Sequence, residues 1–141
     1  MPNHFHLLIY EHSEGGISKF MQKLTTAYTM YFNKKNDRSG ALFQGKFKAT
    51  HVDEDRYLQY LLSYIHLNPV KLIDPKWKEN GITDRTAAEK YLQKYTPSSY
   101  LDYLGENRAE NMIVDMSVLP DYFDSARDFK QHVTEWLDYN S

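Results

Sequence analysis

The segment DEDRYLQYLLSYIHLNP, residues 53–69, has the pattern of an amphipathic helix whose two ends are both marked. Asp53 is a suitable N-cap, and the two acidic residues after it lie where the positive end of a helix dipole favours them. Leucine, isoleucine and tyrosine side chains then follow at helical spacing through residues 57–65. Pro69 disfavours helical geometry in the residue before it, so we predict that the helix ends near Asn68.

The chain before this helix predicts two strands separated by a second helix. Residues 41–52 alternate between apolar and polar side chains, which is typical of a strand, and one face of that strand is basic. Residues 36–40 are turn-forming. Residues 17–32 repeat apolar side chains at i, i+3, i+4 and i+7, the spacing of an amphipathic helix. Residues 4–10 are apolar-rich and are soon followed by two glycines, which indicates another strand.

The chain after this helix indicates a linker and several short helices. A polar stretch follows Pro75, and no internal repeat is present. The predicted helical pieces cover residues 86–94, 98–104, 118–123 and 126–139. We therefore divide the chain into an α+β domain at residues 1–74 and a helical C-terminal extension at residues 75–141.

Length and composition limit the classes of protein that are possible. A chain of 141 residues with 41% hydrophobic residues has the size and content of one folded domain. The absence of cysteine excludes disulfides, thiolate catalysis and zinc fingers. The longest apolar runs are only a few residues, and no basic segment precedes an apolar stretch at the N-terminus. We therefore expect a soluble cytoplasmic protein with no membrane partner.

The net charge of −2 hides an uneven distribution along the chain. Residues 17–51 carry seven lysines and arginines against one acid, a net charge of +6, whereas residues 98–141 carry a net charge of −6. Such asymmetry favours a face that binds a polyanion, although solvated faces alone also produce it. The candidate DNA contacts in the basic segment are Lys19, Lys23, Lys34, Lys35, Arg38, Gln44, Lys46 and Lys48.

Two short motifs carry the candidate chemistry. Strand periodicity puts His4 and His6 on the same side of the predicted sheet. Tyr64 and Asn68 are four residues apart, so they face the same way on the helix with Cβ atoms roughly 6 Å apart. Each motif alone is weak, because exposed histidines on an edge strand and a buried tyrosine near a helix cap explain them equally well.

Together these four side chains are typical of a metal-assisted nucleophile. Two imidazoles and one amide oxygen leave half of an octahedral shell open, which suits Mg²⁺ or Mn²⁺ held also by a phosphate oxygen and water. Tyrosine, with a reference pKa of about 10, is a poor nucleophile unless a cation stands beside the phosphodiester. The product, a phosphotyrosine linkage, conserves bond energy, so the DNA strand can be rejoined.

Four ordered blocks over nearly the whole chain resemble one known family. They are MPNHFHLL at residues 1–8, GALFQGKFK at 40–48, YIHLNPVK at 64–71 and SSYLDYLG at 98–105. In these blocks the chain resembles the single-tyrosine HUH transposases, which are IS200-like, and among them the REP-associated tyrosine transposases.

The resemblance implies a ferredoxin-like antiparallel sheet with helices, forming an HUH-type catalytic domain at residues 1–74. It implies a divalent metal at His4, His6 and Asn68, and Tyr64 as the nucleophile that forms a 5′-phosphotyrosine on single-stranded hairpin DNA. In the family a strand and a helix precede the Pro-Asn-His motif, so we expect this chain to lack them. Its incomplete sheet is then prone to pair with another chain, for example in a homodimer.

Other residues of the same helix compete for these roles. Tyr57 and Tyr60 also lie on it, but the spacing to Asn68 and the family motif favour Tyr64 as the nucleophile. His66 points roughly 160° away from Tyr64 around the helix, so we interpret it as a surface or packing residue.

Three functions follow as hypotheses. The first is a metal-dependent enzyme that nicks and joins single-stranded DNA, and the intact set of four site residues favours it. The second is a truncated or domesticated module that binds hairpin DNA without cutting it, which the missing N-terminal elements favour. The third is a hydrolase of small phosphate esters, against which the basic segment and the lack of a carboxylate ligand near the histidines argue.

Overall fold

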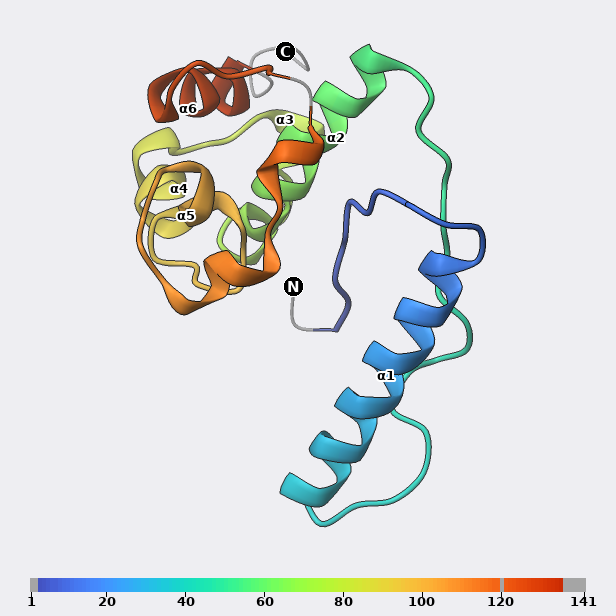
Figure 1. The fold of residues 1–141 in the computed structure, drawn as a ribbon. Helices are drawn as coiled ribbons and strands as arrows, with labels where there is room; N and C mark the ends of the chain where they lie inside the picture. The colour runs from blue at the N-terminus through green and yellow to red at the C-terminus, as the bar shows by residue number, and fades with distance from the viewer. Residues whose placement is uncertain (1–2, 120, 136–141) are drawn as a thin grey trace. The chain divides into compact units, whose positions relative to one another are not determined.

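The computed structural model describes residues 3–119 and 121–135, and the chain falls into two compact units. One unit comprises residues 8–51, and the other comprises residues 1–7 together with residues 52–141. Figure 1 shows helix α1 of the first unit in blue and helices α2 to α6 of the second unit in green to red. Each unit is described by itself.

The unit of residues 8–51 is built on α1, Gly16–Lys35. The helix begins after Gly15, whose φ of 74° is in the left-handed region that favours glycine. The Glu11 carboxylate accepts a hydrogen bond from the backbone N–H of Ile17 at 3.0 Å, which partners one free donor of the first turn. At the other end, the Asn36 side chain donates to the carbonyl of Phe32 at 2.8 Å. The predicted helix at residues 17–32 is confirmed.

The apolar stripe of α1 is largely open to solvent within this unit. Only Met21 of the helix is buried, whereas Met30 and Tyr31 are 68% and 57% exposed. Phe43, from the segment after the helix, contacts Tyr28 with ring centroids 6.1 Å apart. The pattern that predicted the helix therefore did not indicate a partner for its apolar face.

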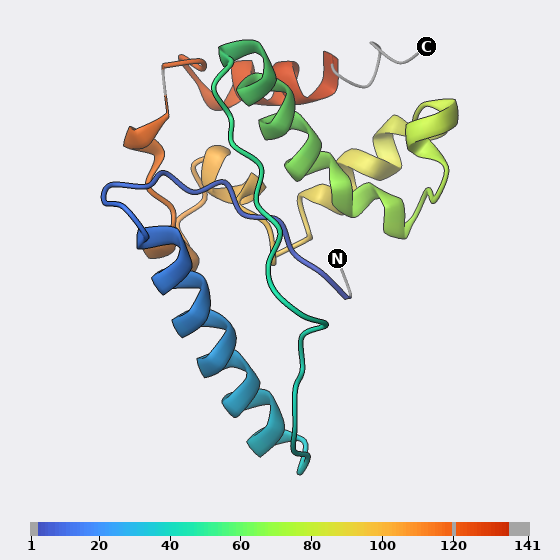
Figure 2. The same cartoon turned by 90° about the vertical axis from the view of Figure 1, so that its right-hand side faces the viewer.

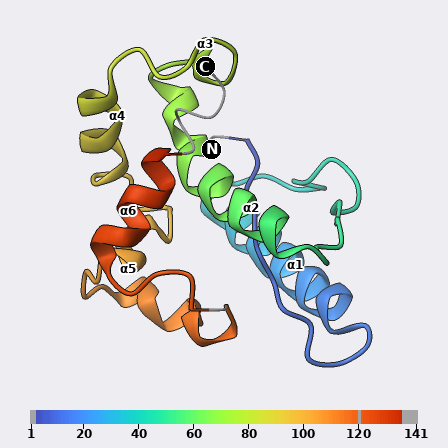
Figure 3. The ribbon, with the colours of Figure 1, turned by 90° about the horizontal axis from the view of Figure 1, so that it is seen from above.

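The larger unit is a small helical bundle. Its elements are α2 (Asp55–Leu67), the 3-10 helix η1 (Asn68–Leu72), α3 (Trp77–Asn80), α4 (Arg85–Leu92), α5 (Tyr100–Tyr103), the 3-10 helices η2 (Ala109–Ile113) and η3 (Met116–Val118), and α6 (Ala126–Glu135). Helix α6 packs against α2, and η1 packs against both α2 and α4. Figures 2 and 3 show α6 beside α2 from two directions.

The core of this unit joins residues from both halves of its sequence. The buried side chains are Leu67, Val70, Trp77, Ala88, Leu92, Tyr100, Leu101, Phe129 and Val133. Burying apolar area of this kind stabilises a fold by about 25 cal/mol per Å². Helix α2 therefore has a fixed place in the bundle, and so do the side chains that it carries.

The predicted ferredoxin-like antiparallel sheet is wrong. No residue in the described ranges 3–119 and 121–135 is in a strand. Residues 4–10 and 41–52 do have strand-like patterns, but a strand is stable only when its backbone pairs with a neighbouring strand and one face is covered. Both segments are mostly exposed instead, so their alternating side chains do not form the two faces of a sheet.

The predicted helices agree with the structure better than the predicted strands do. Helices α2, α4 and α5 confirm the predictions at residues 53–68, 86–94 and 98–104 within two residues at most boundaries. The short helix α3 was missed, because the prediction treated that stretch as a linker. The prediction at 118–123 is wrong for the residues that the structure describes, where η3 ends at Val118.

Two sequence predictions have more limited outcomes. Helix α6 confirms the predicted helix from residue 126 to residue 135, and the rest of that prediction, to residue 139, lies outside the described residues. The domain boundary at residues 74 and 75 stays a prediction.

Among the described residues, no helix is both long enough and apolar enough to cross a lipid bilayer.

Candidate functional site

Helix α2 presents Tyr64 in its last turn. The residue is partly buried. Asn68 caps the helix, with its backbone N–H donating to the carbonyl of Tyr64, and only 3% of the residue is exposed. The predicted helix end therefore places Tyr64 and Asn68 on the same turn.

The N-terminal segment of the same unit brings two imidazoles to this turn. The ring centroids of His4 and His6 are 5.3 Å apart in an edge-to-face arrangement. The His6 ring meets the Tyr64 ring at 5.8 Å, also edge to face. Nδ1 of His4 lies 2.7 Å from Oδ1 of Asn3, which fixes the orientation of the His4 ring. Among the described residues, Asn68 makes no hydrogen bond to either histidine.

A lysine that sequence reasoning missed completes this cluster. The Lys78 ammonium donates a hydrogen bond to the Tyr64 hydroxyl at 2.9 Å. The same nitrogen lies 4.0 Å from the centroid of the Tyr64 ring, within cation–π range. Lys78 is 14 residues further along the chain, and its sequence context, a polar stretch after a proline, gave no signal for this contact.

The surroundings of His6 favour its neutral form. Burial lowers the pKa of His6, and the positive charges of His4 and Lys78 lower it further. A neutral imidazole has a lone pair free for a metal ion or a proton. The cluster is therefore cationic at Lys78 and able to act as a ligand at His6.

The other tyrosines of α2 continue the row away from the histidines. The rings of Tyr60 and Tyr64 are 5.8 Å apart, and those of Tyr57 and Tyr60 are stacked at 6.0 Å. Tyr57 and Tyr60 are each about one third exposed, and burial raises the pKa of Tyr60. The His6 contact and the Lys78 hydrogen bond distinguish Tyr64 from both neighbours.

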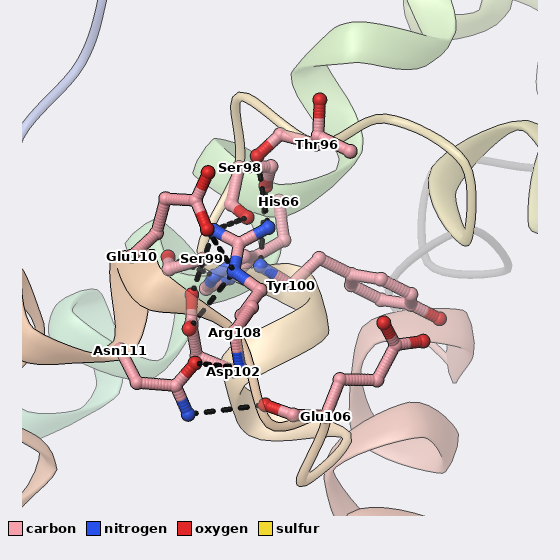
Figure 4. Close-up of polar contacts among 10 residues, drawn as sticks. All are labelled: His66, Thr96, Ser98, Ser99, Tyr100, Asp102, Glu106, Arg108, Glu110 and Asn111. Carbon is pink, nitrogen blue, oxygen red and sulfur yellow. Dashed lines mark hydrogen bonds and ion pairs between the residues drawn. The ribbon is translucent and has the colours of Figure 1, made fainter.

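His66 belongs to the core. Its Nδ1 lies 2.7 Å from the carbonyl oxygen of Leu62, so Nδ1 carries the proton, and Nε2 accepts from the Ser99 hydroxyl at 2.8 Å. Figure 4 shows this link between α2 and the loop before α5. The rings of Tyr103 and Phe129 each lie 5.2 Å from the His66 ring. The interpretation of His66 as a packing residue, one of the two alternatives, therefore agrees with its position.

The predicted DNA-contacting residues all lie on the other unit. All eight are exposed: Lys19, Lys23, Lys34, Lys35, Arg38, Gln44, Lys46 and Lys48. Lys34 and Lys35 occupy the last turn of α1, where the negative end of the helix dipole favours them. Lys35 and Arg38 also stand over the rings of Tyr31 and Phe32, at 5.6 and 5.7 Å.

The imidazole pair has a spacing that suits a shared metal ion. A ring centroid lies about 3.2 Å from an ion bound at the usual nitrogen distance of about 2.1 Å, so two rings on one ion are roughly 4.5 to 6.4 Å apart. The observed 5.3 Å between His4 and His6 falls in that range. No group of three or more His, Cys, Asp or Glu side chains in the described ranges could hold an ion. A site here would therefore need a ligand of another type, such as the Asn68 amide.

Comparison with known families identifies the N-terminal half of the chain. Residues 1–68 match the family model described as "Transposase IS200 like". This segment of the chain is similar to the IS200-like transposases. The match contains His4, His6, Tyr64 and Asn68, and it ends ten residues before Lys78. Comparisons with curated proteins and with solved structures gave no match.

The family assignment confirms the resemblance drawn from the four sequence blocks. It makes the chain a relative of DNA-transposing enzymes, and DNA is therefore the partner that the family implies. The nucleophile, the metal ligands and the form of the DNA are finer statements, which we treat as proposals.

Proposed function

We propose that this chain cleaves and rejoins single-stranded hairpin DNA through a 5′-phosphotyrosine intermediate on Tyr64. The observation that carries the proposal is the meeting of Tyr64 with His6 at 5.8 Å, in residues that match an IS200-like transposase. Tyr64 is also partly exposed at the end of α2. Among the contacts between described residues, the ring contact with His6 and the hydrogen bond from Lys78 are both made to Tyr64.

The side chains around Tyr64 have separable tasks in this proposal. The phenolic oxygen of Tyr64 attacks the scissile phosphorus, and the 3′ oxygen of the DNA leaves. His4, His6 and the Asn68 amide would hold a divalent ion, Mg²⁺ or Mn²⁺. Such an ion, when bound, neutralises charge on the phosphate oxygens and orients them. The lowered pKa of His6 supports this role, because a ligand imidazole must be neutral.

The basic residues of the other unit would supply affinity for the DNA backbone. Lysine and arginine contacts to phosphates are largely independent of sequence, and they release counterions from the strand. The exposed cations of α1 and of the segment after it are suited to this task. The choice of target sequence would then depend on base contacts elsewhere.

A covalent-adduct assay tests the proposal. The protein is incubated with a labelled hairpin oligonucleotide and Mg²⁺, and the products are separated on a denaturing gel. We expect a labelled protein band that requires the metal. Tyr64→Phe should abolish the band, because it removes only the attacking oxygen, while Tyr57→Phe and Tyr60→Phe should retain it.

These variants are matched, because all three remove one phenolic hydroxyl from α2 and keep the ring. Binding of the hairpin by each variant, followed by fluorescence anisotropy, shows whether the fold and the DNA contacts survive. An adduct that persists in Tyr64→Phe would contradict the assignment of the nucleophile.

A second candidate function is a module that binds hairpin DNA without cutting it. The observation that favours it is that His4 and His6 lie on an exposed segment with no sheet in the described residues to hold it. On this alternative the unmodified chain binds the hairpin but forms no adduct with either Mg²⁺ or Mn²⁺. The same assay therefore separates the two functions.

A further inference from the structure

Lys78 is placed at the reacting oxygen by the core of the larger unit. Its neighbour Trp77 is 7% exposed and is part of the hydrophobic core. The turn before it is closed by the backbone N–H of Asp74 donating to the carbonyl of Val70 at 2.8 Å. This turn brings α3 back toward α2, so that Lys78 reaches the Tyr64 side chain.

The contact between the two side chains is specific in its geometry. The 2.9 Å distance from Nζ to the hydroxyl is the usual length of a hydrogen bond from a nitrogen donor to an oxygen. The same ammonium lies over the ring, 4.0 Å from the centroid, so it approaches the phenol from the face of the ring. Lys78 is partly buried, and partial burial strengthens an interaction with a charged group.

We propose that Lys78 is a further catalytic residue, whose ammonium stabilises negative charge on the Tyr64 oxygen during both cleavage and rejoining. The inference rests on the proposed function, because it requires Tyr64 to be the nucleophile. It extends the site beyond the part of the chain that matches the family, which ends at residue 68.

The proposed step balances in each direction. In cleavage, the Tyr64 oxygen forms a bond to phosphorus and the bond from phosphorus to the 3′ oxygen breaks. The phenolic proton passes to solvent, and the 3′ oxygen takes up one proton from solvent to leave as a hydroxyl. In rejoining, the 3′ hydroxyl forms a bond to the same phosphorus and loses its proton to solvent, while the bond from phosphorus to the Tyr64 oxygen breaks and that oxygen leaves with the electron pair and takes up a proton from solvent.

Lys78 remains an ammonium throughout and changes no bond. It donates one hydrogen bond to the phenolic oxygen, which still has a lone pair for phosphorus. A fixed cation next to an oxygen that gains charge stabilises the transition state more than the ground state. Removing one such donor typically slows a reaction by roughly 100-fold or more.

The absence of cysteine from this chain allows a direct test. Lys78→Cys introduces the single thiol of the protein, and 2-bromoethylamine then converts that side chain into a thioether analogue of lysine. We expect adduct formation to be roughly 100-fold slower in the untreated variant, and most of the lost rate to return after aminoethylation. Lys78→Gln, which keeps a hydrogen-bond donor but no charge, should stay slow.

Matched controls separate catalysis from folding. Lys76→Met removes an exposed lysine two residues away, and we expect the adduct rate to stay within about twofold of the unmodified chain. Hairpin affinity should be similar before and after aminoethylation of Lys78→Cys, because the proposed effect is on the rate. The rejoining rate, measured from purified adduct with an added 3′-hydroxyl strand, should fall and recover in parallel with the cleavage rate.

The outcomes distinguish this inference from the proposed function. If the unmodified chain forms no adduct, the proposed function fails. If the unmodified chain forms the adduct and untreated Lys78→Cys is equally fast, the role of Lys78 alone is overturned. A slow variant that aminoethylation does not restore would also overturn it, because the loss would then come from structure and not from the missing charge.

Discussion

Histidine occupies two contrasting environments in the larger unit. His4 and His6 are exposed on the N-terminal segment, whereas His66 is 2% exposed between α2 and the loop before α5. Nδ1 of His66 donates to the Leu62 carbonyl, and in the neutral ring Nε2 accepts from the Ser99 hydroxyl. Burial lowers the pKa of His66 to about 4. This residue therefore links the stability of the unit to pH.

We expect the free energy of unfolding to fall as the pH is lowered from about 6.5 to about 4. The unfolded chain takes up a proton at the ordinary histidine pKa, and the folded chain resists protonation until about pH 4. This shift corresponds to at most about 3 kcal/mol. Urea unfolding at pH 7 and at pH 4.5 measures the effect, with His66→Gln as the control. An equal loss of stability in the control would show that other groups are responsible.

The residue contacts of the site were only partly predictable from the sequence. Tyr64 and Asn68 share one turn of a helix, and a spacing of four residues is enough to predict that. The pairing of His6 with Tyr64 required the family resemblance. The contacts of Lys78 and of His66 with Ser99 depend on how the chain folds back after Pro69, and no local pattern encodes that path.

At the scale of the elements, the link between α5 and the loops around it depends on one ion pair. Nε and Nη2 of Arg108 donate to the two carboxylate oxygens of Asp102, each at 3.2 Å, and the remaining donors reach the carbonyls of Thr96 and Ser98. Figure 4 shows this network. The Asp102 side chain is only 2% exposed, so its buried negative charge depends on the ion pair with Arg108 for stabilisation.

We expect Asp102→Asn to destabilise the larger unit by about 3 kcal/mol, because it leaves the Arg108 charge without its buried partner. Glu110→Gln is the matched control. Glu110 is also an ion-pair partner of Arg108, at 3.7 Å, but its side chain is 51% exposed, and such pairs contribute roughly 0 to 1 kcal/mol. Urea unfolding of the two variants measures the difference. Equal effects would contradict the importance of burial here.

The longer helices were predictable, whereas the two predicted strands are absent from the described residues, for a physical reason. A helix forms its hydrogen bonds within one segment, so the periodicity of residues 53–69 was sufficient to predict α2, although its N-cap is Glu54 and not the predicted Asp53. A strand needs a second segment beside it, and the alternation at residues 4–10 and 41–52 does not provide one. The exposed stripe of α1 is a similar case, because periodicity predicts a helix without saying what covers it.

At the scale of the whole molecule, the charges separate along the sequence. The candidate DNA contacts lie in residues 8–51, and the side chains around Tyr64 lie in the other unit. Binding and chemistry should therefore respond to different substitutions. Changes around Tyr64 should alter adduct formation, and changes in the basic segment should alter affinity for DNA.

We expect DNA affinity to fall steeply with salt concentration, because bound lysines release counterions from the strand. Lys46→Ala combined with Lys48→Ala should reduce the slope of log K against log salt by about 1.4, at roughly 0.7 for each lost contact on single-stranded DNA. The effect should be similar for a hairpin and for an unrelated single strand. Fluorescence anisotropy over a range of salt concentrations measures the slope.

Lys90→Ala combined with Lys94→Ala is the matched control, because it removes two exposed lysines of the other unit, one in the last turn of α4 and one just after it. The slope for this control should not change. If both pairs change the slope equally, or if the Lys46 and Lys48 pair affects only one DNA sequence, the basic segment is not the general backbone contact.

The central claim is that Tyr64 becomes covalently linked to DNA, and peptide mapping tests it most directly. The adduct is trimmed with nuclease and digested with trypsin, which releases residues 57–71 as one peptide containing Tyr57, Tyr60 and Tyr64. Fragmentation in a tandem mass spectrometer then locates the attached nucleotide. The account predicts a 5′-phosphoryl nucleotide on Tyr64, and a nucleotide on Tyr57, on Tyr60 or on a different peptide would contradict it.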